Sequence, residues 1–310
     1  MRKTKNNPQN TPDKKKRKRR AWKIVLSIVL VIVVLMGAVV GGSMIHNRNF
    51  EVSFYQITSD KVSNNIRIIE LSDLHNSEFG KNNEQLVEKI RNLKPDLIFY
   101  GGDMMNEKDS DYSVLFNLSD ELCKIAPVYA CYGNNELDQQ LFYDKTFKKQ
   151  LKDHNVKLIS NEALDVEVGN SVIQLIAISD NVKQFDAPTN NAKKFINSLE
   201  PTENCRICLT HYPELFNEKL LNKGIDVAFT GHAHGGHIRL PYFGGLYSPG
   251  EGFLPKFSEG VVEADDGTQV VVSRGLGNSS EAFTMKNLPP IQIPRINNQP
   301  ELVVVDISWY

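Results

Sequence analysis

The chain has 310 residues, of which 41% are hydrophobic, so it can bury a substantial core in one large domain or two small ones. Its charges are unevenly distributed. Residues 1–23 contain eleven Lys or Arg and one Asp, so the net charge of −1 leaves about −11 for the other 287 residues. An acidic body excludes a general nucleic-acid binder, which would present a basic face, and we expect no nucleic-acid partner.

An apolar run directly follows the basic segment. Residues 24–45 are Ile, Val, Leu, Ala, Gly and Met, interrupted only by Ser27 and Ser43. Roughly 20 such residues cross a bilayer, and positive charge before a span keeps that side cytoplasmic. We therefore predict a cytoplasmic basic tail (1–23), a single-pass transmembrane anchor (24–45) in the cell membrane, and an extracytoplasmic domain (46–310).

A cleavable signal peptide is the competing interpretation, because a basic region precedes the run and Gly41, Gly42 and Ser43 lie near its end. The apolar core exceeds the roughly 7–15 residues usual for such peptides, which favours an uncleaved anchor. Arg19-Arg20 fits twin-arginine export only weakly, since residues 21–23 add no support.

Three short apolar runs are each followed by polar side chains of the types that bind metals. The runs and their followers are 66–71 with Asp73 and His75, 97–100 with Asp103, and 127–132 with Asn134. Helical spacing over 83–93 and 112–125 separates the runs. This succession predicts an α/β sheet with a site at the carboxyl ends of its strands, where ligands sit in such sheets.

The rest of the chain continues with strands and a few helices. We expect strands at 52–57, 157–159, 164–168, 172–178, 205–210, 225–230 and 302–307, helices at 139–154 and 192–199, a loop at 241–257, and a hairpin at 261–273 around Asp266-Gly267. Cys205 and Cys208 lie on one predicted strand with their sulfurs on opposite sides, which favours buried free thiols. Disulfides are the alternative if the domain lies outside the cell.

Residues 231–237, Gly-His-Ala-His-Gly-Gly-His, place three imidazoles at the end of an apolar strand. His232 and His234 would leave opposite faces of an extended segment. Glycines accept backbone angles that other residues resist, so a loop bounded by them can turn both rings toward one centre. The segment indicates a metal-binding loop, and the alternative is a polar turn that is rich in His.

Together these motifs resemble those of the calcineurin-like metallophosphoesterases. Asp73-x-His75, Gly102-Asp103, Gly133-Asn134, His211 and Gly231-His232-x-His234 occur in the order and approximate spacing of that family. The segments 235–236, 239–241, 273–277 and 294–302 are similar to its membrane-anchored bacterial, YkuE-like branch. The resemblance implies a two-sheet αββα sandwich behind the N-terminal transmembrane helix.

The resemblance also implies two divalent metal ions. One would take Asp73, His75, Asp103 and His234, and the other Asp103, Asn134, His211 and His232. Asp103 would then bridge two cations that stabilise the oxygens of an in-line displacement at phosphorus. Mixed oxygen and nitrogen ligands suit Mn, Fe or Zn and do not choose among them. A degenerate site that folds but binds no metal is the alternative.

Two residues near the predicted ligands depart from the family pattern. Asn135 stands where the family has a His that contacts phosphate and is thought to protonate the leaving oxygen, and an amide has no such proton to give. Loss of a general acid typically removes roughly 10²–10⁴-fold in rate. His237 stands where Gln is more common, and replacement acid and hydrogen-bonded turn residue are both open roles. Arg274 supports its loop or meets substrate phosphate.

We therefore predict a metal-dependent hydrolase of phosphomonoesters, phosphodiesters or pyrophosphates on the outer side of the membrane. Tethering to the membrane favours a phosphorylated substrate that is lipid-linked or part of the cell envelope. The alternative is a catalytically weak or inactive dimetal protein that binds a phosphorylated ligand or partner.

Overall fold

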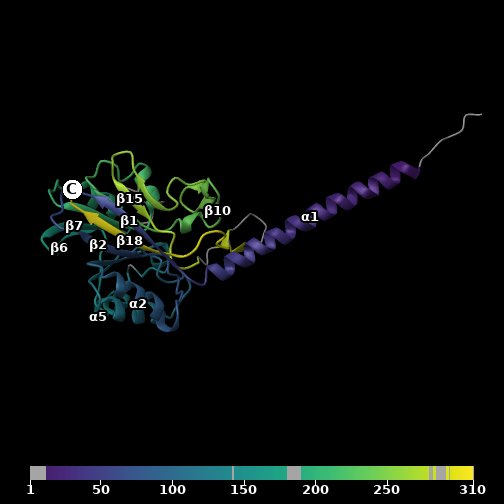
Figure 1. Ribbon diagram of the computed structural model, residues 1–310. Helices are drawn as coiled ribbons and strands as arrows, with labels where there is room; N and C mark the ends of the chain where they lie inside the picture. The colour runs from purple at the N-terminus through teal and green to yellow at the C-terminus, as the bar shows by residue number, and fades with distance from the viewer. Residues whose placement is uncertain are drawn as a thin grey trace, which may run out of the picture.

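The computed structural model describes residues 12–141, 143–179, 190–278, 282–283, 291–292 and 294–309. A long helix, α1 (Pro12–His46), leads into a domain built on two six-stranded sheets (Figure 1). One apolar core fills the space between the sheets, and each outer face carries a further core under helices. The predicted α/β two-sheet sandwich is therefore confirmed.

The first sheet has the strand order β1-β18-β2-β3-β4-β5. Strands β2 to β5 are parallel, β18 is antiparallel to β2, and β1 is parallel to β18. Their bounds are β1 Glu51–Thr58, β2 Ile66–Leu71, β3 Leu97–Tyr100, β4 Val128–Ala130, β5 Val156–Leu158 and β18 Glu301–Ser308. The central strands are buried on both faces, as expected for parallel strands that are covered on each side.

The second sheet has the order β14-β15-β9-β8-β7-β6, with β7, β8, β9 and β15 parallel and an antiparallel hairpin at each edge. Its strands are β6 Glu162–Val168, β7 Ser171–Ile178, β8 Cys205–Thr210, β9 Val227–Thr230, β14 Gly260–Glu263 and β15 Gln269–Val272. The last hairpin turns at Asp266-Gly267 as predicted, because Gly267 adopts a φ of 91° that other residues resist.

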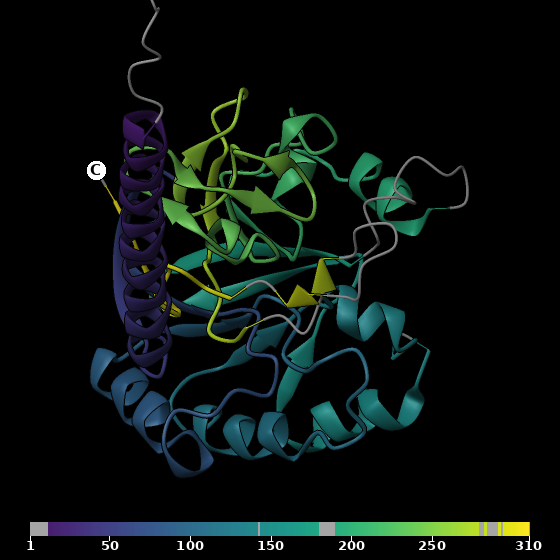
Figure 2. The same ribbon diagram turned by 90° about the vertical axis from the view of Figure 1, so that its right-hand side faces the viewer.

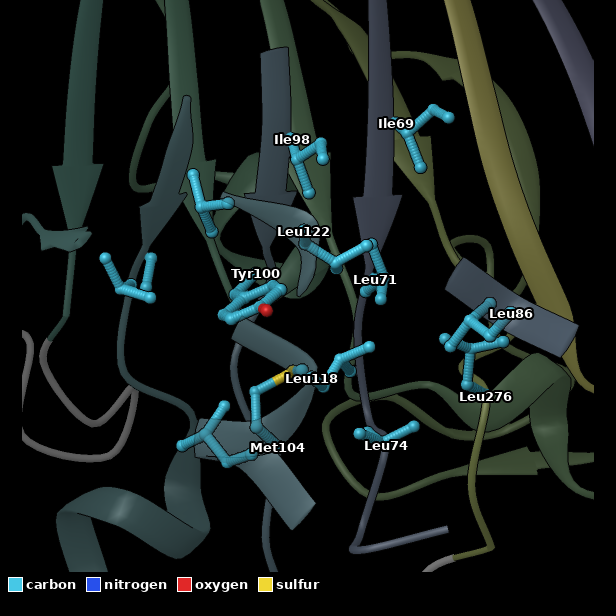
Figure 3. Packing of buried hydrophobic residues seen from close by; sticks show 14 of the residues in the cluster. Ile69, Leu71, Leu74, Leu86, Ile98, Tyr100, Met104, Leu118, Leu122 and Leu276 are labelled. Carbon is cyan, nitrogen blue, oxygen red and sulfur yellow. The ribbon is translucent and has the colours of Figure 1, made fainter. Parts of the chain in front are cut away.

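Helices on the first sheet bury their apolar stripes against its outer face. On α2 (Glu84–Leu93) the buried residues Leu86, Val87 and Ile90 share one face. They join a cluster with α3 (Ser113–Leu122) and α5 (Lys145–Asp153), shown from close by in Figure 3. The second sheet is covered by α6 (Asn191–Asn197) and the short 3₁₀ helix η3 (Pro213–Asn217).

The core between the sheets contains Phe99 and Phe229, whose rings pack perpendicular with centroids 5.1 Å apart. Cys205 points into this core, whereas Cys208 points into the core on the other side of its strand. Both thiols are buried and free, which confirms the sequence-based expectation.

Two predicted elements differ from the structure. The helix expected at 139–154 begins at Lys145, because the Asp144 side chain caps it by accepting a hydrogen bond from Thr146 N at 2.7 Å, and Phe142 lies outside the described residues. A short helix, α4 (Asn134–Asp138), occupies the segment after β4. The predicted loop 241–257 contains short strands, and the remaining small elements are η1 Lys81–Asn83, η4 His234–Gly236, β10 Arg239–Leu240, β11 Gly244–Gly245, β12 Tyr247–Ser248, β13 Gly252–Phe253, β16 Ala282–Phe283 and β17 Ile291–Gln292.

Helix α1 extends well into the basic tail, because Lys and Arg are good helix formers and Pro12 suits the first helical position. Residues 16–46 form a helix long and apolar enough to cross a membrane, and residues 1–11 of the tail lie outside the described residues. The helix projects away from the domain in Figure 1, and in Figure 2 that side of the molecule faces the viewer. Its end is fastened by two hydrogen bonds, from Asn297 N to Ser43 Oγ (3.2 Å) and from Asn47 Nδ2 to Arg295 O (2.8 Å).

The topology fixes which edge of the first sheet faces the anchor. Strand β1 begins at Glu51, shortly after α1 ends at His46. Since β18 is parallel to β1 and antiparallel to β2, the carboxyl ends of β2, β3 and β4 lie at the edge where β1 begins. We call this the anchor edge.

Candidate metal centre

Loops at the anchor edge bring the predicted ligands together from both sheets. Asp73 and His75 follow β2, Asp103 follows β3, and His211 and His234 come from the loops after β8 and β9. Their ligand atoms form two buried groups, each with all atoms within 4.8 Å of one another: Asp73, His75 and His234, and Asp73, Asp103 and His211. Asp73 belongs to both groups, so the two candidate ion sites are adjacent.

In the first group, His234 Nε2 lies 3.4 Å and His75 Nε2 4.0 Å from Asp73 Oδ1. The two Nε2 atoms are 3.4 Å apart. The His75 and His234 rings are stacked with centroids 5.1 Å apart, and His237 extends the stack at 5.2 Å from His234. His237 is thus beside the site, with its buried Nδ1 lacking a hydrogen-bond partner among the described residues.

In the second group, His211 Nε2 lies 3.5 Å from Asp103 Oδ2 and 3.8 Å from Asp73 Oδ1. Its Nδ1 donates a hydrogen bond to Gly101 O at 2.8 Å, which leaves Nε2 as the nitrogen facing the carboxylates. Nε2 is buried and has no hydrogen-bond partner among the described residues. A metal-ligating His characteristically donates its other N–H to a carbonyl in this way, so the residues present fit a divalent ion.

Asn134 and His232 lie next to the second group. Asn134 opens α4 directly after β4, and its Nδ2 donates to Asn135 Oδ1 at 3.1 Å. The His232 ring packs edge-on against His211 with centroids 5.0 Å apart, and its backbone N donates to Asp73 Oδ2 at 3.2 Å. Their coordination of an ion stays a prediction.

The backbone of these loops is strained. Asp73, His75, Asp103, His232, His234 and His237 all have φ between 47° and 66°, a region that residues with a Cβ rarely adopt. Such strain persists only where surrounding contacts enforce it, and it clusters at functional sites. Gly275 shows the close packing behind it, since a Cβ there would lie 2.6 Å from Asp73 Cβ.

The buried charges divide into an ion pair and neutral imidazoles. Burial raises the pKa of Asp103, but the charges of His211 and His75 outweigh it and lower that pKa to about 2. Burial lowers the pKa of His211, but Asp103 and Asp73 overcome it and raise that pKa to about 10. Burial lowers the pKa values of His75 and His234 and takes that of His237 to about 4. Neutral imidazoles are the form that binds metals, so an ion held by His211 would take the place of the proton on its Nε2.

Asn135 is 2% exposed and packs behind His75. Its Nδ2 donates to Met105 O at 2.8 Å and lies 3.1 Å from His75 Nδ1, while its backbone N donates to Asp103 Oδ1 at 2.8 Å. Its amide is therefore directed at two neighbouring loops, and its contact with phosphate stays a prediction.

Arg274 is bound to carboxylates. Its side chain pairs with Glu51 and lies within 3.6 Å of Glu259 and 3.3 Å of Glu301. Of the two roles that the sequence left open, these contacts favour support of the loop.

Three buried residues that hold or adjoin the site escaped sequence reasoning. Glu136 accepts hydrogen bonds from the backbone N atoms of Asp103, Met104 and Gly133, and so joins the loops after β3 and β4. Glu70 is buried on β2 with neither oxygen hydrogen-bonded among the described residues. Arg295 Nη2 lies 3.3 Å from His234 Nδ1. Their charge could have revealed them in the sequence, because Glu70 interrupts an apolar run and Glu136 and Arg295 lie within the motif segments.

Comparisons with known proteins agree with this geometry. Residues 66–236 match the profile of the family described as calcineurin-like phosphoesterase. The chain is 25% identical over 189 residues to the phosphodiesterase YaeI of Escherichia coli, covering 60% of this chain and 66% of YaeI. It is 23% identical over 251 residues to the uncharacterized metallophosphoesterase YkuE of Bacillus subtilis, covering 76% and 84%. The match thus spans just under two thirds of YaeI.

Among solved structures, the chain is similar to a purple acid phosphatase from yellow lupin (Lupinus luteus) seeds. The TM-score is 0.41 at 12% identity, with 80% of this chain and 54% of the lupin chain covered.

Proposed function

Because this chain belongs to the calcineurin-like phosphoesterase family, we propose that it is a dimetal phosphoester or pyrophosphate hydrolase that acts at the outer surface of a membrane. The strongest support is the buried His211 Nε2, which faces Asp103 and Asp73 with no hydrogen-bond partner among the described residues. Because His211 Nδ1 donates to Gly101 O, Nε2 is the nitrogen left to bind a cation between the carboxylates.

The family uses two divalent metals, and Asp73, His75, His234, Asp103 and His211 are placed to hold them. Two such ions supply charge stabilisation to the attacking and leaving oxygens of a phosphoryl group. The protein's own contribution is positioning. Rigid loops fix the ligands in strained conformations before substrate arrives, so less ordering is required when it binds.

Lipid-linked or envelope phosphates are the substrates that we propose, on the basis of where the centre lies. The predicted ligands sit at the anchor edge, where β1 begins at Glu51, shortly after α1 ends at His46. The β10–β13 region follows the His-rich loop and lies on the same side of the domain as α1 (Figure 1). We call its large exposed apolar side chains the apolar rim: Leu240, Tyr242, Phe243, Phe253 and Leu254. Exposed aromatic residues next to a membrane favour contact with its interface.

The orientation also belongs to this proposal. Ten net positive charges precede the span, which favours a cytoplasmic N-terminus and an outer domain.

Turnover of p-nitrophenyl phosphate and its diester by the full chain with added Mn²⁺ tests the hydrolase proposal, with Asp103→Asn as the comparison. We expect the variant to lose activity by at least roughly 10²-fold. Equal, negligible rates in both proteins would instead favour the binding function, which the absence of a family acid at Asn135 makes the second candidate.

A further inference from the structure

A cavity of about 410 Å³ lies between the foot of the anchor and the candidate metal centre. One wall comes from Asn47 and Arg48, which link α1 to β1. The others come from residues 77–79, which follow the Asp73 and His75 loop, and from residues 276–278 with Arg295. The cavity therefore adjoins the loops of the metal centre but is not lined by the predicted ligands.

Arg295 lies in this lining and is 2% exposed. Its Nε donates to Gly277 O at 2.9 Å, and its Nη2 donates to Gly275 O at 3.2 Å and also contacts Gly277 O and His234 Nδ1. Among the described residues its Nη1 has no hydrogen-bond partner, and the charges of Asp73 and Glu301 act on the guanidinium only from a distance. A buried N–H group without an acceptor is costly, so such groups are normally hydrogen-bonded.

The nearby Arg274 is a buried arginine of the same protein that is paired with carboxylates. It is similarly buried at 8% exposure, but it contacts three carboxylates, those of Glu51, Glu259 and Glu301. The contrast indicates that Nη1 of Arg295 is available to an acceptor that the described residues do not supply.

The remaining lining fits an anion that carries several oxygens. Arg48 is exposed on the linker and adds a second guanidinium, and Ser77 adds a hydroxyl. Glu78 also lines the cavity and is exposed, so the two arginines leave a net charge of +1. Guanidinium groups pair well with phosphate because their N–H groups match its oxygens.

We propose that this cavity is a second phosphate-binding site, separate from the dimetal centre, with Arg295 at its buried end and Arg48 at its exposed end. Asn47 Nδ2 donates to Arg295 O at 2.8 Å, so the site is attached directly to the foot of the anchor. The phosphate comes from a membrane lipid headgroup or from a soluble phosphate compound. Binding there does not depend on hydrolysis, so the proposed enzymatic function can fail without this site failing.

The test is calorimetric titration of the chelator-treated full chain with inorganic phosphate, in phosphate-free maltoside micelles. We expect one site. Arg295→Gln removes charge-assisted hydrogen bonds and should weaken binding by about tenfold or more. Arg48→Gln removes an exposed charge, leaves the fold intact and should weaken binding by roughly threefold.

Two controls define the outcome. Arg91→Gln removes an exposed arginine of α2 that does not line the cavity, and Asp103→Asn alters the metal centre, so both should bind phosphate like the unmodified protein. Absence of binding by the unmodified protein, or equal binding by Arg48→Gln and Arg91→Gln, would overturn the proposal.

A second arm distinguishes the sources of phosphate. The same titration is made on protein in phosphatidylglycerol nanodiscs. Loss of the inorganic phosphate signal there, with the signal retained in micelles, assigns the site to a lipid headgroup. A signal of equal strength in both assigns it to a soluble phosphate compound.

Discussion

His211 Nε2 lies 3.5 Å from Asp103 Oδ2, although the two residues follow strands of different sheets. Asp103 N in turn donates a hydrogen bond to Glu136 Oε2 at 2.9 Å, and Asp73 Oδ1 lies 3.8 Å from the same His211 nitrogen. The metal centre is therefore a joint between the two sheets, and its ligands cannot assemble unless both sheets are folded and packed.

Asp73 and Asp103 are both candidates for the carboxylate that bridges the two ions, and the amount of metal bound by variants tests the assignment to Asp103. The family resemblance gives Asp103 the bridging position, whereas the geometry places Asp73 in both ligand groups. We expect Asp103→Asn to lower the bound metal more than His75→Ala, which removes a ligand of one ion. Elemental analysis of the purified full-chain variants measures this, with Asp73→Asn alongside. Equal metal content in Asp103→Asn and His75→Ala would count against the bridge.

Glu70 gives a prediction for pH dependence. Burial, with the charges of Asp73 and Glu301, raises the pKa of Glu70 well above its ordinary value. The folded protein then binds more protons than the unfolded chain above pH of about 4.3, so the free energy of unfolding falls as pH rises. In chelator-treated protein, Glu70→Gln should remove this loss and so stabilise the fold more at pH 8 than at pH 5.

Denaturant titration at pH 5 and pH 8 checks the effect of Glu70→Gln. Glu121→Gln, on a partly exposed residue of α3, is the control and should change stability equally at both pH values. A gain for Glu70→Gln that is no larger at pH 8 than at pH 5 contradicts the expectation.

The sequence was sufficient for the strands and for the residues that follow them, because each ligand comes directly after a buried apolar run. Asp73, Asp103 and Asn134 could thus be placed at the carboxyl ends of one sheet from the sequence alone, whereas His211 was joined to them only through the family resemblance. Contacts between distant segments were not accessible in the same way. The approach of Asn135 Nδ2 to His75 Nδ1 joins residues 60 positions apart, and no local pattern encodes it.

Arg295 was hidden for a related reason. It was visible only as part of a segment similar to the family, and the lack of a hydrogen-bond partner for its Nη1 among the described residues is a property of the folded surroundings. The start of α5 was misplaced because helical spacing continues through residues 139–144, whereas the cap at Asp144 decides where the helix begins.

The topology of the anchor has a direct test. A protease added outside intact cells should remove the domain and leave residues 1–23 protected, because positive charge before the span keeps that side in the cytoplasm. Immunoblotting of tags at the two ends measures this. Protection of the domain would refute the outer location, and release of the domain without protease would favour a cleaved signal peptide.

The apolar rim predicts a difference between membrane-borne and soluble substrates. Tyr242 and Phe243 are 104% and 72% exposed, and partial burial of such rings in the interface is worth on the order of 1.4 kcal/mol. Tyr242→Ser with Phe243→Ser should therefore slow hydrolysis of a phosphate ester in vesicles by roughly tenfold while leaving p-nitrophenyl phosphate unaffected. Tyr143→Ser, on a residue that is 78% exposed outside the rim, is the matched control. Equal loss on both substrates would point to a folding defect instead.

The last prediction concerns the leaving group. Asn135 offers no proton near neutral pH, and its amide is directed at Met105 O and His75 Nδ1. Departure of the leaving oxygen must then rely on its own stability and on the metals, so rates should fall steeply as leaving-group pKa rises. Asn135→His should accelerate an alkyl phosphate most, and a tenfold gain corresponds to about 1.4 kcal/mol of barrier. The aryl ester serves as the internal control, and metal content is measured in parallel because the variant loses the contact with His75.

His237 is the competing source of that proton. Its ring stacks on His234 with centroids 5.2 Å apart, and burial lowers its pKa to about 4, which keeps it neutral at pH 7. An imidazole that is neutral at pH 7 is a poor general acid, so we expect His237→Gln to slow the hydrolysis of aryl and alkyl esters equally. A shallow leaving-group dependence in the unmodified protein, no gain from Asn135→His and a selective loss on the alkyl ester in His237→Gln would together assign the proton to His237, and Asn135 would then only position His75.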